Sequence, residues 1–182
     1  ENAPGMALSV AGGSNNSSAN IQLEEADSGD SQIFEIRAAW GVYYQLVNLS
    51  SGKVLDCTAG QSSDGTNIQQ YESNMTNAQL FFPIKNADGS WTFSSRLRRT
   101  AVLDVAGAGK SAGTNIQLYT ANRSAAQKFR LLAPVKNEIL ENGCQIRSAL
   151  NTDRVLNVAG GSQSDFANLE SNDANGSDSE KF

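Results

Sequence analysis

The stretch TNIQLYTANRSAAQKF, residues 114–129, decides the fold because its pattern occurs four times in the chain. In each copy an Asn is followed twelve positions later by Gln or Glu, any residue and Phe; these four Asn residues are Asn20, Asn67, Asn115 and Asn168. The leucines that open the copies, Leu8, Leu55, Leu103 and Leu156, lie 47, 48 and 53 residues apart. A period of this length indicates a repeat architecture whose units are too small to bury an apolar face alone.

The pattern within each copy predicts short β-strands. In the third copy Leu103 and Val105 alternate with Val102 and Asp104, as the two-residue period of a strand requires. A Gly-rich turn follows, residues 106–115, and a strand at 116–120 comes after it. Further strands are expected before three of the copies, in VYYQLVN (42–48), SWTFSSRL (90–97) and CQIRSAL (144–150). Each repeat is therefore predicted to hold four short strands.

Composition agrees with an all-β protein and excludes several functions. The 182 residues are 39% hydrophobic and include 16 Gly, which suits many turns. A formal net charge of -5 argues against nucleic-acid binding, and the basic cluster Arg96, Arg98 and Arg99 is predicted to be a solvated turn. With no His and two Cys, neither a metal site nor a cofactor is expected. No apolar run is long enough to span a membrane.

Both cysteines occupy positions that are apolar in other copies. Cys57 aligns with the inward Val10 and Val105, and Cys144 aligns with Tyr44 and Trp91. Both are expected to fill the core as unpaired thiols, although two cysteines alone leave their pairing and the redox compartment open.

The four copies in register resemble the ricin B-chain-like lectins, which include carbohydrate-binding module family 13. The terminal motif of that family, Gln-x-aromatic, is matched at Gln32-Ile33-Phe34, Gln79-Leu80-Phe81, Gln127-Lys128-Phe129 and, in weakened form, Glu180-Lys181-Phe182. The resemblance covers residues 6–182, and the repeats look most like bacterial secreted versions. It implies a β-trefoil, in which three repeats form a six-stranded barrel capped by three hairpins.

The resemblance also implies one shallow sugar site per repeat, built from an Asp, an aromatic platform and polar side chains. Two copies match this pattern: the second with Asp56, Gln69, Tyr71 and Gln79, and the third with Asp104, Gln117, Tyr119 and Gln127. The first copy has Ser9 and Glu24, and the fourth has Asn157 and Asn172, at the Asp and platform positions. These two are expected to be inactive. Many sugar-binding members carry an Asn before the motif's Gln, where this chain has Ala78 and Ala126.

Structural roles compete with these functional ones. Asp56 and Asp104 could cap the turns that follow them, and Tyr71 and Tyr119 could be ordinary exposed strand residues. Gln79, Gln127 and the four repeated Asn are expected to satisfy buried backbone groups, because they recur where the site is lost. The repeated Phe34, Phe81, Phe129 and Phe182 are expected in the core.

A threefold fold leaves one copy in surplus. The barrel strands are expected around Ile33, Tyr44, Phe81, Phe93, Phe129 and Ile146, so that residues 1–150 form one trefoil closed by the lead strand of the fourth copy. Residues 151–182 then compete with residues 6–24 for one hairpin position. They are a surplus partial repeat, or part of a second or domain-swapped trefoil.

The function predicted is non-catalytic binding of polysaccharide or glycoprotein glycans by a secreted or cell-surface module. A covalently linked catalytic domain and a domain-swapped homodimer are the two further partners that the sequence leaves open. The alternative is a trefoil that has lost sugar binding and acts as a spacer or protein-interaction module. An enzyme is not expected, because the acidic residues show no pair of the kind that glycosidases use.

Overall fold

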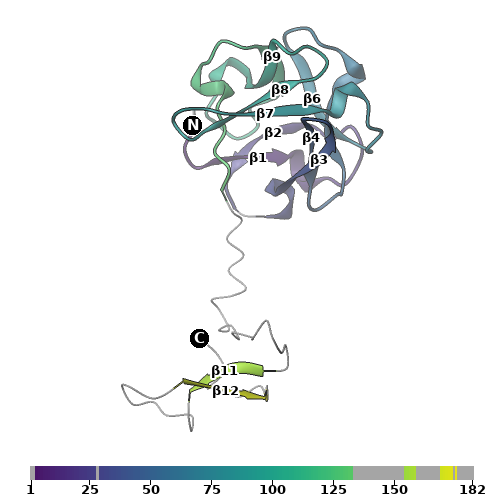
Figure 1. Ribbon diagram of the computed structural model, residues 1–182. Helices are drawn as coiled ribbons and strands as arrows, with labels where there is room; N and C mark the ends of the chain where they lie inside the picture. Colours follow the sequence, from purple (N-terminus) through teal and green to yellow (C-terminus); the bar gives the residue numbers. More distant parts are fainter. Residues whose placement is uncertain (1–2, 28, 133–153, 159–168, 174, 176–182) are drawn as a thin grey trace. The chain divides into compact units, whose positions relative to one another are not determined.

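The computed structural model describes residues 3–27, 29–132, 154–158, 169–173 and 175. The chain divides into two units, Glu1–Pro134 and Val135–Phe182. The described part of the first unit consists of β-strands joined by turns and by single turns of 3-10 helix (Figure 1). The predicted all-β class is confirmed.

Each copy in the first unit uses the same order of elements: a strand, a 3-10 turn, a second strand and a second 3-10 turn. The strands are β1 (Met6–Val10), β2 (Ile21–Glu25), β3 (Phe34–Trp40), β4 (Tyr43–Asn48), β5 (Val54–Cys57), β6 (Thr66–Tyr71), β7 (Phe81–Lys85), β8 (Trp91–Ser95), β9 (Ala101–Val105) and β10 (Ile116–Thr120). The 3-10 turns are η1 (Ala11–Gly13), η2 (Asp30–Gln32), η3 (Thr58–Gly60), η4 (Asn77–Gln79), η5 (Ala106–Ala108) and η6 (Ala125–Gln127).

The barrel strands share one sheet with the hairpins β5–β6 and β9–β10, whereas the hairpin β1–β2 forms a sheet of its own. One eight-stranded sheet has the order β3-β4-β5-β6-β10-β9-β8-β7, and an additional β4–β7 pairing joins strands of successive copies. Phe129 continues the barrel by bridging to Trp91. Strands therefore occur near four of the six predicted barrel positions, and an isolated bridge lies at the fifth, Phe129, while the sixth, around Ile146, lies outside the described residues.

The hairpins β1–β2, β5–β6 and β9–β10 contact one another through the backbone in a ring. The amide of Ser18 donates to Gln70 O at 2.8 Å, that of Gly65 to Leu118 O at 2.9 Å, and that of Gly113 to Leu23 O at 2.8 Å. Each hairpin thus donates to the next one, and the third donates back to the first. The first-copy hairpin, β1–β2, is thus one of the three members of this ring.

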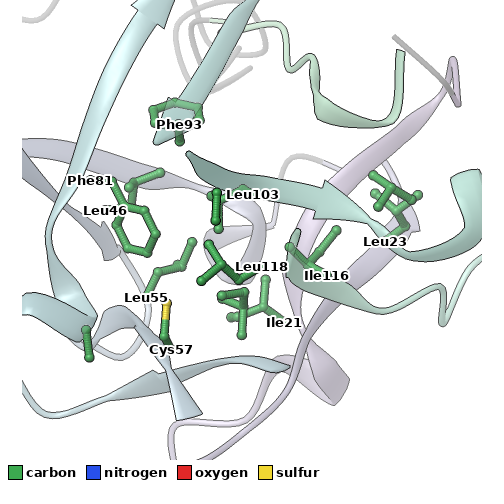
Figure 2. Close-up of a cluster of buried hydrophobic side chains, with 14 of the residues drawn as sticks. Ile21, Leu23, Leu46, Leu55, Cys57, Phe81, Phe93, Leu103, Ile116 and Leu118 are labelled. Atoms are coloured by element: carbon green, nitrogen blue, oxygen red, sulfur yellow. The ribbon is translucent and has the colours of Figure 1, made fainter. Parts of the chain in front are cut away.

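Inward-facing residues from all three copies make one core. Ile21, Leu55, Leu103, Ile116 and Leu118 point toward one another in Figure 2 and are at most 1% exposed. As expected, the alternating strand pattern places these side chains on the buried face.

Cys57 lies in this core as a buried free thiol with no exposed surface. Burial, as the main cause, raises the pKa of its thiol to about 12, and the charge of Asp56 adds to the effect. The expected core role of Cys57 is confirmed, and Cys144 lies outside the described residues.

Gln70 is a core residue whose role the sequence pattern missed. It stands where the other hairpins have Leu23 and Leu118, yet it is fully buried. Its Nε2 donates to the carbonyls of Ser14 and Asn16, both at 2.8 Å. The side chain therefore fixes the loop of the first copy onto the second.

The described part of the second unit holds the strands β11 (Arg154–Val158) and β12 (Leu169–Asp173). They pair antiparallel, with Asn157 opposite Glu170 and Val155 opposite Asn172. This is the register of the second and third copies, so the fourth copy also forms the predicted hairpin.

Candidate functional site

The second and third copies bring the predicted site residues together by strand register. Asp56 on β5 lies opposite Gln69 on β6, and Tyr71 pairs with Val54 two positions along. In the third copy Asp104 lies opposite Gln117 in the same way. Alternation along β6 and β10 then places each Tyr on the same face as its Gln.

Each carboxylate is held between two glutamine amides. Gln69 Nε2 donates to Asp56 Oδ1 at 3.0 Å, and Gln79 Nε2 donates to Asp56 Oδ2 at 3.1 Å. The third copy repeats this arrangement, with distances of 2.9 Å from Gln117 and 3.0 Å from Gln127 to Asp104. Both oxygens of each carboxylate are engaged but not saturated, because an ionised carboxylate accepts about four hydrogen bonds.

The motif glutamines lie behind the carboxylates. Gln79 is fully buried and Gln127 nearly so. Gln79 also donates to Glu72 O and accepts from the amide of Asn74, both at 2.8 Å. Gln127 makes the equivalent contacts, and so does Gln32 in the first copy, which lacks the Asp. The expected structural role of these glutamines agrees with this geometry: they orient the Asp and brace the loop.

Three of the repeated Asn residues join neighbouring hairpins through backbone pairing, and the fourth, Asn168, lies outside the described residues. Asn20 bridges to Gln69, Asn115 to Gln22, and Asn67 pairs with Gln117. The side-chain oxygen of Asn115 is buried without a hydrogen-bond partner. The expectation that its side chain satisfies a backbone group is therefore wrong for that oxygen.

A surface depression of about 530 Å³ lies over the carboxylate of the second copy. Asp56, Gln69 and Tyr71 line it, and Tyr71 is 39% exposed while Asp56 is 6% exposed. Ala78, which precedes the motif Gln, also lines it, together with residues that the sequence pattern did not indicate: Ala59, Gly60, Asn74, Thr76, Asn77 and Leu97.

Three of the missed residues, Asn74, Thr76 and Asn77, come from the loop between Tyr71 and the motif Gln, whose conformation the strand pattern does not specify. Asn74 forms a local turn in which its Oδ1 accepts the amide of Thr76 at 3.0 Å. The third copy repeats this turn with Asn122 and Ser124. Leu97 comes from the segment that opens the third copy, so the depression is shared between copies.

The first copy does not rebuild the site. Ser9 Oγ donates to Val10 O, and Glu24 accepts a hydrogen bond from Gln22 Nε2. The position taken by Asp56 and Asp104 is occupied here by Ser9, which carries no carboxylate. In the fourth copy Asn157 and Asn172 lie on the paired strands β11 and β12 at the equivalent register.

The basic cluster at residues 96–99 is not simply a solvated turn. Arg98 forms an ion pair with Asp64, and the guanidinium of Arg96 lies 3.5 Å from the centre of the Trp40 ring. Two of the three arginines therefore have structural partners, and only Arg99 is classed as exposed. The prediction is wrong because the ion pair joins residues 34 positions apart, which local charge patterning cannot show.

Two further features bear on the site's chemistry. Among the described residues, no group of three or more His, Cys, Asp or Glu side chains is placed to hold a metal ion. No helix in the described part of the chain is long and apolar enough to cross a membrane.

Comparison with known proteins places this geometry in a family. The family model described as ricin-type β-trefoil lectin domain-like matches residues 1–71 and 37–119, which together cover more than half of the chain. No curated protein sequence matches the chain.

Solved structures give the same result. The chain is similar to the designed threefold symmetric protein ThreeFoil, with 31% identity, a TM-score of 0.69 and coverage of 71% of this chain and 91% of that one. It is also similar to an exo-β-1,3-galactanase from Clostridium thermocellum (28% identity, TM-score 0.66), covering 69% of this chain but 27% of the enzyme. The Rhizoctonia solani agglutinin, at 20% identity and a TM-score of 0.61, shares the fold over 68% of this chain and 83% of its own.

Proposed function

Because this chain belongs to the ricin-type β-trefoil lectin family, we propose that it binds carbohydrate without catalysis, through the sites of the second and third copies. The observation that carries the proposal is the carboxylate held between two glutamine amides beside an exposed Tyr, present in these two copies and absent from the first.

The geometry suits a neutral sugar. A carboxylate fixed by two amides retains free lone pairs, which accept hydrogen bonds from neighbouring hydroxyl groups. The face of Tyr71 or Tyr119 then packs on the apolar face of the pyranose ring. Asp56 is the one charged residue lining the depression of the second copy, so an anionic sugar would be repelled there.

Loop residues between Tyr71 and Gln79 offer the side-chain amides that the family's Asn before the motif Gln would otherwise provide. Ala78 occupies that position, but Asn74 and Asn77 line the same depression. Their side-chain amides offer donors that complement the acceptor Asp56.

Two shallow sites on one chain favour polymeric or clustered glycans. Each site alone is expected to be weak, and two sites engaged on one polysaccharide or glycoprotein raise the apparent affinity. This suits a secreted or cell-surface accessory module, in agreement with the similarity to part of a glycan-degrading enzyme. A covalently linked catalytic domain or a domain-swapped homodimer belongs to the same proposal.

The test is an NMR titration with galactose, lactose and β-1,3-galactobiose, together with a glycan array. We expect Tyr71 and Tyr119 ring signals to shift in the wild type, and binding to fall at least tenfold in the double variant Asp56→Asn and Asp104→Asn, since a hydrogen bond to a charged group contributes about 1.5–3 kcal/mol.

Ser9→Ala is the matched control, because Ser9 holds the equivalent position in the first copy, and it should leave binding unchanged. Undiminished binding by a folded double variant would show that these sites are misassigned. An empty array for the wild type, with a protein partner recovered instead, would favour the spacer or interaction module. Release of sugar by the pure chain would overturn the non-catalytic assignment.

A further inference from the structure

We infer that Asp64, a residue of the second copy, is a positioning residue for the carbohydrate site of the third copy. This inference rests on the proposed function of that site and adds to it a dependence between copies.

Asp64 lies in the loop between β5 and β6, and its carboxylate reaches the end of β10 in the next copy. It accepts the backbone amide of Thr120 at 2.9 Å and the Thr120 hydroxyl at 2.9 Å. Arg98 donates to the same carboxylate and, at 3.1 Å, to the hydroxyl of Thr120. Two residues from separate segments, Asp64 and Arg98, therefore fix Thr120, which follows the platform Tyr119.

The contacts continue from Thr120 to the site itself. The carbonyl of Thr120 accepts Gln127 Nε2 at 3.0 Å, and the same nitrogen donates to Asp104 Oδ2 at 3.0 Å. A continuous path of hydrogen bonds thus joins Asp64 to the carboxylate proposed to accept sugar hydroxyls. The hydrogen bond from the Thr120 amide to the Asp64 carboxylate is charge-assisted, and such bonds are stronger than bonds between neutral groups.

The second copy provides an internal comparison, because its site lacks this brace. Ser17 stands at the position equivalent to Asp64 and carries no carboxylate. Glu72 stands in place of Thr120 and pairs with Lys53 at 2.9 Å, within its own copy. Removal of Asp64 should therefore affect one of the two sites.

The ion pair between Asp64 and Arg98 is not by itself expected to matter much. Asp64 is classed as exposed, and an exposed ion pair contributes little to stability. Asp64 acts on the site through its hydrogen bond with the Thr120 amide and through the path from Thr120 to Asp104. Its replacement is therefore expected to change the geometry of the site and not the stability of the fold.

The first experiment needs no ligand. In the full chain, Asp64→Ala should shift the side-chain amide NMR signals of Gln117 and Gln127 and leave those of Gln69 and Gln79 in place. Asp64→Asn, which keeps one acceptor oxygen for the Thr120 amide, should restore part of the shift. Unchanged Gln117 and Gln127 signals in Asp64→Ala would overturn the inference, whatever the chain binds.

The second experiment titrates the same variants with lactose, following Tyr119 for the third copy and Tyr71 for the second. Asp64→Ala should weaken binding at Tyr119 about threefold or more and leave Tyr71 unaffected, with Asp64→Asn between it and the wild type. Glu35→Gln, which removes an exposed carboxylate paired with Arg37 on β3, is the control and should change neither site.

Equal weakening at both sites would show a general structural role and overturn the inference. If the ligand-free shifts occur as expected but no sugar binds the wild type at either Tyr, the proposed function fails while the positioning of Asp104 by Asp64 stands.

Discussion

At the scale of single residues, the site consists of few groups, and their roles depend on burial. Asp56 and Asp104 are about 5% exposed, so their orientation is set by the glutamines and not by solvent. The exposed Tyr beside each of them is free to meet a ligand. The Asp and Tyr could be predicted from the sequence because they recur at fixed spacing in two copies.

Asn74, Asn77 and Leu97 could not be predicted in the same way. Asn77 and Leu97 reach the depression through a loop conformation and through the neighbouring copy, which leave no signature in local spacing. Asn74 recurs as Asn122, but its spacing does not show that the loop places it in the depression. Gln70 was missed for a related reason, since its polar contacts lie more than fifty positions away along the chain.

The buried thiol gives a prediction at this scale. Because burial raises the pKa of Cys57 to about 12, the thiol should stay protonated and unreactive toward iodoacetamide at pH 8 in the folded protein, and react on unfolding. Its contribution to stability is fully present below the unfolded pKa near 9 and is lost between pH 9 and pH 12. Peptide mass mapping distinguishes Cys57 from Cys144. Rapid labelling of Cys57 in native protein at pH 8 would contradict its position in the core.

At the scale of elements, the twelve-residue spacing between the repeated Asn and the motif glutamine reflects how a 3-10 turn is attached to the strand before it. The motif glutamine ends η2, η4 or η6 and reaches back to the carbonyl seven positions earlier. This contact exists in all three copies of the first unit, with or without the Asp. The spacing is therefore evidence for the fold, and the Asp and Tyr carry the evidence for function.

Comparison of two equivalent glutamines separates these contributions. Gln79→Leu should lower the free energy of unfolding by about 2–4 kcal/mol, because it leaves Oδ2 of the buried Asp56 and the Glu72 carbonyl without a donor. Gln32→Leu removes the equivalent backbone contacts from a half-buried position without a carboxylate, and should cost about 1 kcal/mol. Urea unfolding measures both. Equal costs would show that Gln79 does not support Asp56.

At the scale of the whole molecule, three equivalent phenylalanines differ in burial. Phe81 has no exposed surface, whereas Phe34 and Phe129 are only half-buried. Phe81 lies on a strand with a partner on each side, since β7 pairs with both β4 and β8. Among the described residues, the other two phenylalanines have a barrel neighbour on one side, β4 for β3 and Trp91 for Phe129.

This difference supports the prediction that residues 144–150 supply a sixth barrel strand, which the structure leaves untested. We expect a chain ending at residue 150 to be more stable to urea than one ending at residue 134, because additional apolar surface is buried. Ile146→Asp in the 150-residue chain should remove most of the gain. Equal stability of the 134- and 150-residue chains would show that the barrel boundary was placed wrongly.

The ring of backbone hydrogen bonds among the hairpins limits how many copies one trefoil can hold. Each hairpin is hydrogen-bonded to the other two, with bonds in both directions between the first and second and between the third and first, so the ring is closed at three members. A chain can gain repeats of this kind one at a time, but a closed ring of this type takes up three hairpins. With four copies, one hairpin is therefore predicted to be left over, and a tandem array whose copy number is not a multiple of three should leave one or two.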